Sequence, residues 1–289
     1  MLEIKKFANG FEYIEIINKS ASAKIALQGA HIFEYTSELK KEMLWLSPTS
    51  DFEYGRAIRG GIPICWPRFG VEDKSMPSHG FSRTALFELV SVEELDEWRT
   101  KVIMRLRDTK ESRSIWDYKF ELDVAFIISE SLSVELITKN RDTKEFMITQ
   151  ALHTYFSVSN IDDVLIKGLE NTRYIDTLTD ETLVQEASIK IKEETDRVYL
   201  DVNSEIILED KLKKISLNTV GSNSTVVWNP WIEKGARMSG MRAEAYKEFV
   251  CIESANAFDD FRLIEAGDSH RLRLVLNSVK STKLFFDNR

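Results

Sequence analysis

The segment Lys119–Ile128, with the sequence KFELDVAFII, decides the fold class. Apolar side chains occupy every second position of this segment, and the charged residues Lys119, Glu121 and Asp123 stand between them. Successive side chains of a strand point to opposite faces, so a period of two places the apolar side chains on one face. The pattern therefore predicts a strand that is half-buried against a core.

The same period of two recurs at other places in the chain. It returns after the polar turn 129–131 and again near residue 274, at Leu132, Val134 and Leu136 and at Leu272, Leu274 and Leu276. Helical stripes are scarce, and strands do not alternate with long helices as a parallel α/β sheet requires. The sequence thus predicts an all-β protein, a large antiparallel β-sandwich. Because no linker and no fixed-period repeat divides residues 1–289, we expect a single domain.

Composition and charge restrict the function classes. The 289 residues are 43% hydrophobic and 30% charged, which suits a large core and excludes a disordered chain. Lys and Arg number 39 and Asp and Glu number 47, so the formal charge is −8 and argues against nucleic acid or anionic membrane as a partner. An anionic ligand would need a local basic site.

The chain carries no sign of a membrane span or an export signal. No apolar run approaches the roughly 18 residues of a span, and Met1–Lys6 leads into polar residues, so we expect a cytoplasmic protein. The two cysteines, Cys65 and Cys251, lie far apart in apolar segments. We interpret them as buried free thiols rather than as a disulfide or half of a zinc site.

Glycine and proline concentrate in two regions, 55–80 and 229–240, and loops of this kind often carry function. In the first region, Arg59 precedes the pair Gly60-Gly61. Paired glycines free the backbone for a close approach to a ligand, which predicts a rigid wall of a site. The alternative is a structural turn with solvated arginines.

A histidine and an arginine follow in the segment Pro77–Arg83, at His79 and Arg83. The planar guanidinium suits phosphate or carboxylate, so Arg83 and Arg59 would form a two-armed clamp if the fold brings them together. Arg68 and Lys74 are possible helpers. Ordinary surface charges are the alternative interpretation.

Two further segments hold the candidates for acid–base chemistry. If Gln150–Phe156 is a strand, His153 and Tyr155 share one face, which suits the wall of a cleft. In the strand-like run Phe249–Ala255 the only charged residue is Glu253, and a carboxylate in such apolar surroundings is a candidate general base. A structural histidine and a carboxylate paired with an arginine are the alternatives.

The remaining polar features are weaker. Asp196 lies where an acidic run enters a short apolar strand, and a solvated turn is the default interpretation. Trp228 and Trp231 could stack on a sugar ring or belong to the core. No His-x-His, His-Glu-x-x-His or cysteine pair is present, so we expect no metal site.

Taken together, these segments resemble the hexose-6-phosphate mutarotases (glucose-6-phosphate 1-epimerases), a branch of the galactose mutarotase-like superfamily. Six stretches carry the resemblance in family order: Arg59–Pro63, His79–Arg83, Ala151–Phe156, Thr195–Tyr199, Val227–Pro230 and Phe249–Glu253. The resemblance implies a twisted antiparallel β-sandwich, the galactose mutarotase-like supersandwich, with a sugar cleft and no cofactor or metal.

The resemblance also implies roles for individual residues. Glu253 corresponds to the general base and His153 to the general acid. Arg59 and Arg83 correspond to the residues at the sugar phosphate, His79 lies near the ring, Asp196 holds a hydroxyl, and Ser78 is a further substrate contact. The expected partner is a phosphorylated hexose, and the expected oligomeric state is a monomer.

Three positions depart from the family pattern. Arg68 stands where a second aromatic is frequent, Gly240 where an acid is common, and Ser78 where other members carry glutamine. These changes bear on substrate choice and leave the catalytic pair intact. Two other functions stay open at this point: an aldose 1-epimerase acting on unphosphorylated sugar, and a carbohydrate-binding module without catalysis.

Overall fold

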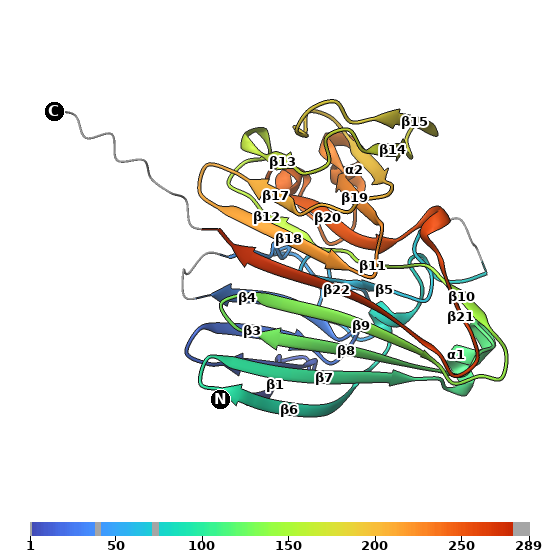
Figure 1. Cartoon of the computed structure of the whole chain (residues 1–289). Coiled ribbons are helices and arrows are strands. Elements are labelled where there is room, and N and C mark those ends of the chain that lie inside the picture. Colours follow the sequence, from blue (N-terminus) through green and yellow to red (C-terminus); the bar gives the residue numbers. More distant parts are fainter. Residues whose placement is uncertain (1, 38–41, 71–74, 280–289) are drawn as a thin grey trace.

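The structure is a computed structural model that describes residues 2–37, 42–70 and 75–279, and it confirms the all-β prediction (Figure 1). Its strand ladders are antiparallel and form two eight-stranded sheets with two smaller ones. The first large sheet runs in the order β13 (Leu165–Lys167), β17 (Ile206–Glu209), β18 (Lys214–Val220), β22 (Ser269–Ser278), β9 (Leu132–Asn140), β8 (Phe120–Ile128), β7 (Arg99–Arg107) and β6 (Glu88–Asp96).

The second large sheet carries the functional site. Its order is β15 (Glu181–Val184), β14 (Arg173–Asp176), β16 (Thr195–Tyr199), β19 (Ser224–Asn229), β20 (Phe249–Asn256), β11 (Gln150–Leu152) and β5 (Ile64–Cys65), and β12 (Tyr155–Ser157) also pairs with β20. The smaller sheets are β1 (Leu2–Lys6), β2 (Glu12–Ile17), β3 (Ala21–Ala26) and β4 (His31–Ser37), and the pair β10 (Phe146–Ile148) and β21 (Arg262–Ile264).

Helices are few and short in the described part of the chain. They are α1 (Lys110–Ile115), α2 (Trp231–Arg237) and the 3-10 turns η1 (Ser82–Thr84), η2 (Ile161–Asp163), η3 (Ala243–Lys247) and η4 (Phe258–Asp260). Within these described residues, no helix combines the length and apolar character needed to cross a membrane.

The three alternating segments of the sequence are neighbours in the first large sheet. Strand β8 pairs with β9 through a tight turn that sets Ile128 opposite Leu132, and β22 lies on the other side of β9 (Figure 1). Leucines 272, 274 and 276 of β22 lie opposite Leu136, Val134 and Leu132. Because all three strands turn the same face inward, they form one wall of the main core.

The alternation in β8 predicts that its polar face is exposed, but the structure buries this face. Glu121 and Asp123 are almost fully buried, because Arg105 of β7 and Lys139 of β9 lie over them and form ion pairs with both. The long side chains of the neighbouring strands therefore cover the carboxylates and bury a face that would otherwise be solvated.

Candidate active site

A cleft of about 820 Å³ opens on the second large sheet. It is lined by all seven side chains to which the family resemblance assigns a role, namely Arg59, Ser78, His79, Arg83, His153, Asp196 and Glu253. Arg68 also lines the cleft, whereas Lys74 lies outside the described residues. The fold thus brings together residues from separate loops and strands that span almost 200 positions of the chain.

Strand periodicity explains why β20 contributes to both the core and the cleft. Val250 and Ile252 point into the main core between the large sheets. Cys251 and Glu253 alternate with them and face the other way, where Cys251 joins a smaller apolar cluster and Glu253 lines the cleft. Glu253 therefore lies on the face of β20 that lines the cleft, while Val250 and Ile252 on the opposite face pack into the core.

His153 lies in a short break between two strands. The predicted strand 150–156 is interrupted, since β11 ends at Leu152 and β12 begins at Tyr155. The two predicted faces are nevertheless preserved: Leu152 and Phe156 belong to the main core, and the His153 and Tyr155 rings lie on the cleft side. The backbone N–H of His153 donates to the carbonyl of Pro63, which holds the break in place.

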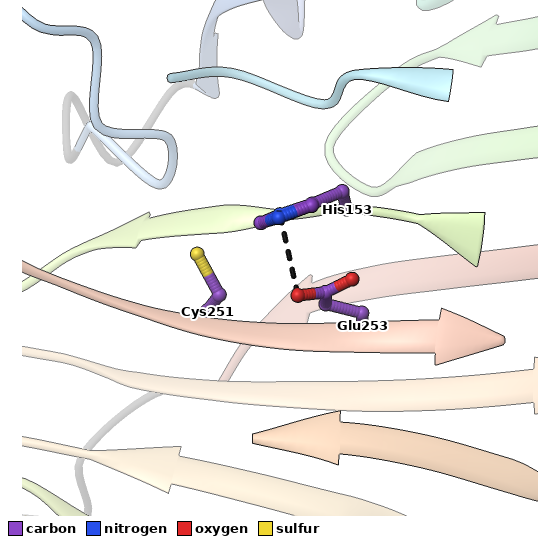
Figure 2. Close-up of side chains that lie close together, drawn as sticks. All are labelled: His153, Cys251 and Glu253. Atoms are coloured by element: carbon purple, nitrogen blue, oxygen red, sulfur yellow. Dashed lines mark ion pairs between the residues drawn. The ribbon is translucent and has the colours of Figure 1, made fainter. Parts of the chain in front are cut away.

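His153 and Glu253 form a buried pair. The Nδ1 atom of His153 lies 3.3 Å from Oε1 of Glu253, and Figure 2 shows the Glu253 carboxylate pointing from β20 toward the imidazole. Glu253 is 1% exposed and His153 is 9% exposed. His153 Nδ1 and Glu253 Oε2 make no hydrogen bond to protein. No described arginine lies within ion-pair distance of Glu253, so a structural Arg–Glu pair is wrong for this carboxylate.

The surroundings shift the pKa of each partner in a different direction. Burial raises the pKa of Glu253 well above its usual 4.5, and the negative charge of Asp196 raises it further. Burial lowers the pKa of His153 well below 6.5, and the neighbouring basic side chains of the cleft act in the same direction. The carboxylate is therefore a stronger base and the imidazolium a stronger acid than either group in water.

His153, Cys251 and Glu253 also form a described group that could hold a metal ion, because one ligand atom of each lies within 4.8 Å of the others (Figure 2). Burial raises the pKa of the Cys251 thiol well above 9.0, so a metal ion would have to displace its proton. The positive charge of Arg59 acts on both His153 and Cys251 and disfavours a further cation. The group therefore suits proton transfer better than metal binding. Both cysteines are buried and free, as predicted.

Gly60 and Gly61 serve a purpose other than the predicted one. A Cβ atom on Gly60 would lie 2.4 Å from the carbonyl oxygen of Trp45, and one on Gly61 would lie 2.4 Å from that of Ile32. Both residues have positive φ, and neither lines the cleft. The glycines therefore permit close contact with the protein's own backbone, and the prediction of a close approach to ligand is wrong.

This tight packing positions Arg59. The buried His31 ring donates to the carbonyl of Gly60 at 2.7 Å, and the backbone N–H of Arg59 donates to the hydroxyl of Ser50 at 2.8 Å. The Arg59 guanidinium donates to the Tyr155 hydroxyl at 3.3 Å, while its Nε is buried without a partner. Arg59 is thus held at the cleft wall with N–H groups that remain available to donate to a ligand.

His79 and Arg83 are carried by the adjacent loop. The backbone N–H of Gly70 donates to Nδ1 of His79 at 3.4 Å, which places the proton of the neutral ring on Nε2. Burial, together with the charges of Arg83 and Arg59, lowers the pKa of His79 to about 3. The Arg83 guanidinium donates to the backbone carbonyl of Ser78. Both arginines line the same cleft, and their positive charges lower the pKa of His79 and of His153.

Asp196 does not lie in a solvated turn, which corrects the default interpretation of its acidic run. It belongs to β16, lies opposite Trp228 of β19 and faces the cleft. Lys234 of α2 lies 3.7 Å from the Asp196 carboxylate and 3.0 Å from Glu194. Burial raises the pKa of Asp196, and Lys234 opposes that shift.

Sequence reasoning missed Lys234, one of the residues that line the cleft. Lys234 enters it only because α2 folds back over β16, and its ammonium also lies 6.0 Å from the centre of the Trp228 ring. Trp228 lines the cleft, whereas Trp231 packs against Tyr246. His31 has a structural role, since its ring supports the loop that carries Arg59.

Comparison with known proteins places the chain in a family. The family model described as aldose 1-epimerase matches residues 12–277. The chain belongs to the aldose 1-epimerase family. It is 33% identical over 270 residues to a protein of Escherichia coli (strain K12) that carries the provisional name glucose-6-phosphate 1-epimerase, with 90% of this chain and 88% of that protein covered. A protein of Cenchrus ciliaris with the same provisional name is 31% identical, with 97% and 88% covered.

Solved structures agree with this family assignment. A Salmonella typhimurium protein provisionally named a mutarotase superimposes with a TM-score of 0.89 at 30% identity, covering 97% of this chain and 94% of that one. A galactose mutarotase-related enzyme of Lactobacillus acidophilus gives a TM-score of 0.72 at 17% identity, covering 94% and 98%. The second likeness shows the fold alone. The predicted galactose mutarotase-like sandwich is therefore confirmed.

Proposed function

We propose that this aldose 1-epimerase family member is a mutarotase that interconverts the α and β anomers of a hexose 6-phosphate, with glucose 6-phosphate as the first substrate to test. The observation that carries the proposal is the buried pair His153 and Glu253, 3.3 Å apart and open to a cleft that also holds two arginines. A cleft built only to bind sugar has no need of a buried carboxylate whose second oxygen lacks a partner.

The pair can open and close a sugar ring by proton transfer. The Glu253 carboxylate removes the proton of the anomeric hydroxyl while protonated His153 donates to the ring oxygen, so the C1–O5 bond breaks and an aldehyde forms. Rotation about the C1–C2 bond presents the other face of the aldehyde. On reclosure His153 takes the proton of the O5 hydroxyl and Glu253 returns its proton to O1. Each positioned transfer contributes about a hundred- to ten-thousand-fold.

The proposed phosphate site rests on unpaired positive charge. No described carboxylate lies within ion-pair distance of Arg59 or Arg83, although the protein as a whole is acidic. Two guanidinium groups that line the same cleft match the planar, bidentate contacts that phosphate accepts. The provisional names of the relatives, glucose-6-phosphate 1-epimerase, support the same substrate class.

The other cleft residues are proposed to orient the sugar. Nε2–H of His79 is available to donate near the ring, and the Asp196 carboxylate is available to accept from a hydroxyl. Ser78, at the exposed end of the cleft, is proposed to contact the substrate. None of these steps requires a redox carrier or a metal ion. We also propose a cytoplasmic monomer with one domain, supported by a core to which both large sheets contribute.

Anomerisation measured by polarimetry or one-dimensional proton NMR tests the proposal. Freshly dissolved α-glucose 6-phosphate and α-glucose are followed at neutral pH with wild type, Glu253→Gln and the matched control Glu93→Gln, an exposed glutamate on β6. We expect acceleration of the phosphorylated sugar over its spontaneous rate, loss of that acceleration in Glu253→Gln and no change in Glu93→Gln.

The other outcomes identify the rival functions. Equal or faster anomerisation of α-glucose would indicate an enzyme for unphosphorylated sugar, and the double variant Arg59→Ala/Arg83→Ala would then keep nearly all of the activity. No acceleration of either sugar, combined with sugar binding that survives Glu253→Gln, would indicate a carbohydrate-binding module.

A further inference from the structure

Tyr155 connects the proposed phosphate site to the proposed general acid. It begins β12, is 2% exposed, and lines the cleft. Its ring and the His153 imidazole are parallel, with an interplanar angle of 7° and centroids 4.9 Å apart. Its hydroxyl accepts the hydrogen bond from the Arg59 guanidinium. One side chain therefore touches both functional ends of the cleft.

His153 depends on packing for its orientation. Its Nδ1 makes no hydrogen bond to protein, so no such bond fixes the ring from that side. Three rings surround it: Tyr155 at 4.9 Å, and His79 and Trp228 edge-on at 5.9 Å each. Tyr155 is the nearest of these and the only one stacked face to face. A stacked ring limits the rotation of its neighbour and so defines the direction in which the imidazole presents its nitrogens.

Tyr155 is itself rigid. Trp45 stacks on it at 5.8 Å, Phe249 packs at 5.2 Å, and the backbone of Tyr155 pairs with Cys251 of β20. Its hydroxyl accepts from the Arg59 guanidinium, which has no carboxylate partner among the described residues. The tyrosine can therefore hold Arg59 and His153 in a constant relation.

We propose that Tyr155 is a positioning residue that couples the anion site to the general acid, its hydroxyl orienting Arg59 and its ring orienting His153. The inference rests on the proposed mutarotase function and adds to it a specificity role for a residue outside the acid–base pair. Tyr155 orients both the Arg59 guanidinium that binds the substrate phosphate and the His153 imidazole. Phosphorylated sugars are therefore favoured by their position relative to His153 as well as by the charge of Arg59.

A double-mutant cycle on the wild-type protein tests the hydroxyl. Tyr155→Phe keeps the ring and removes only the oxygen, and Arg59→Met removes the charge at similar length. Tyr246→Phe, at a buried tyrosine away from the cleft, is the control for loss of a hydroxyl. We expect Tyr155→Phe to raise KM for glucose 6-phosphate about three- to tenfold with little change in kcat. In the Arg59→Met background the same change should alter KM less than about twofold.

Tyr155→Leu tests the ring. Loss of the stacked face should lower kcat for phosphorylated and unphosphorylated glucose alike and shift the limb of the pH profile that belongs to His153. Equal effects of Tyr155→Phe in both backgrounds, or a Tyr155→Leu protein with unchanged kcat and pH profile, would overturn the inference. If wild type accelerates neither sugar, the proposed function fails and the inference with it; an active wild type with an additive cycle overturns the inference alone.

Discussion

Gly240 lies next to Arg59 of the proposed phosphate site, and replacing it with aspartate should weaken phosphate binding. A Cβ atom on Gly240 would lie 3.8 Å from the Arg59 Cβ, with no closer neighbour, so a side chain fits there. Gly240 has a φ of +69°, a conformation that aspartate and asparagine tolerate better than most residues. Gly240→Asp would therefore place a carboxylate beside the guanidinium with little strain.

The size of the effect follows from the distance between the charges. With about 6 Å between carboxylate and guanidinium and an effective dielectric constant of about 20, their attraction is about 2.8 kcal/mol. Gly240 is only partly buried, and water at such a position reduces the attraction to roughly half, about 1.4 kcal/mol. The new carboxylate competes with the substrate phosphate for Arg59, and competition of about 1.4 kcal/mol raises KM for glucose 6-phosphate about tenfold.

Steady-state anomerisation kinetics at low and high salt measure this effect. The matched control is Gly240→Asn, which has the same shape and backbone tolerance without the charge. We expect KM for glucose 6-phosphate to rise in Gly240→Asp only, and the rise to shrink as salt screens the new pair. Equal KM values for the two variants, or a rise that is independent of salt, would refute the electrostatic reasoning and point to a steric effect.

Three further predictions test other parts of the site. The mechanism uses ionised Glu253 together with protonated His153, so each group contributes one limb to the pH profile of kcat/KM. Asp196→Asn removes a charge that raises the pKa of Glu253 and should move the limb that belongs to Glu253 to lower pH, and an unmoved limb would contradict the assignment. Gly80→Ala would place a Cβ 2.1 Å from the Trp66 carbonyl oxygen, whereas Gly55, the matched control, also has positive φ but open space around it. Gly80→Ala should therefore lower the free energy of unfolding in urea by about 1–3 kcal/mol more than Gly55→Ala. Equal losses in the two variants would show that only the backbone strain matters. Lys234→Met removes the partly exposed ion pairs of Lys234, worth about 1 kcal/mol, and should reduce kcat/KM about fivefold. Lys234→Arg should restore kcat/KM, and a failure to restore it would exclude a purely electrostatic role for Lys234.

Local patterns predict local features well, and β20 shows why. The alternation in Phe249–Ala255 depends only on the period of a strand, so it indicates correctly that Glu253 lies on one face and Val250 on the other. The same reasoning pairs His153 with Tyr155, although the strand breaks between Leu152 and Tyr155. These statements need no knowledge of what covers each face.

The side-chain period of a strand does not predict contacts between segments that are distant in the sequence. The role of Gly60 and Gly61 was assigned wrongly, because their glycine requirement comes from Trp45 and Ile32, whose proximity arises only when the loop folds onto β4. The polar face of β8 is buried for a similar reason, since Arg105 and Lys139 come from the neighbouring strands.

The sequence by itself determined the all-β class, the strand faces and the residue types able to carry acid–base chemistry, because these follow from side-chain period and from the chemistry of single residues. Only the tertiary structure decided that His153 lies 3.3 Å from Glu253, that the charges of Arg59 and Arg83 act on the same histidines, and that Lys234 joins the cleft. Those relations depend on strand order and loop packing between segments up to about 190 residues apart, and long-range pairing of this kind is a property of the whole fold.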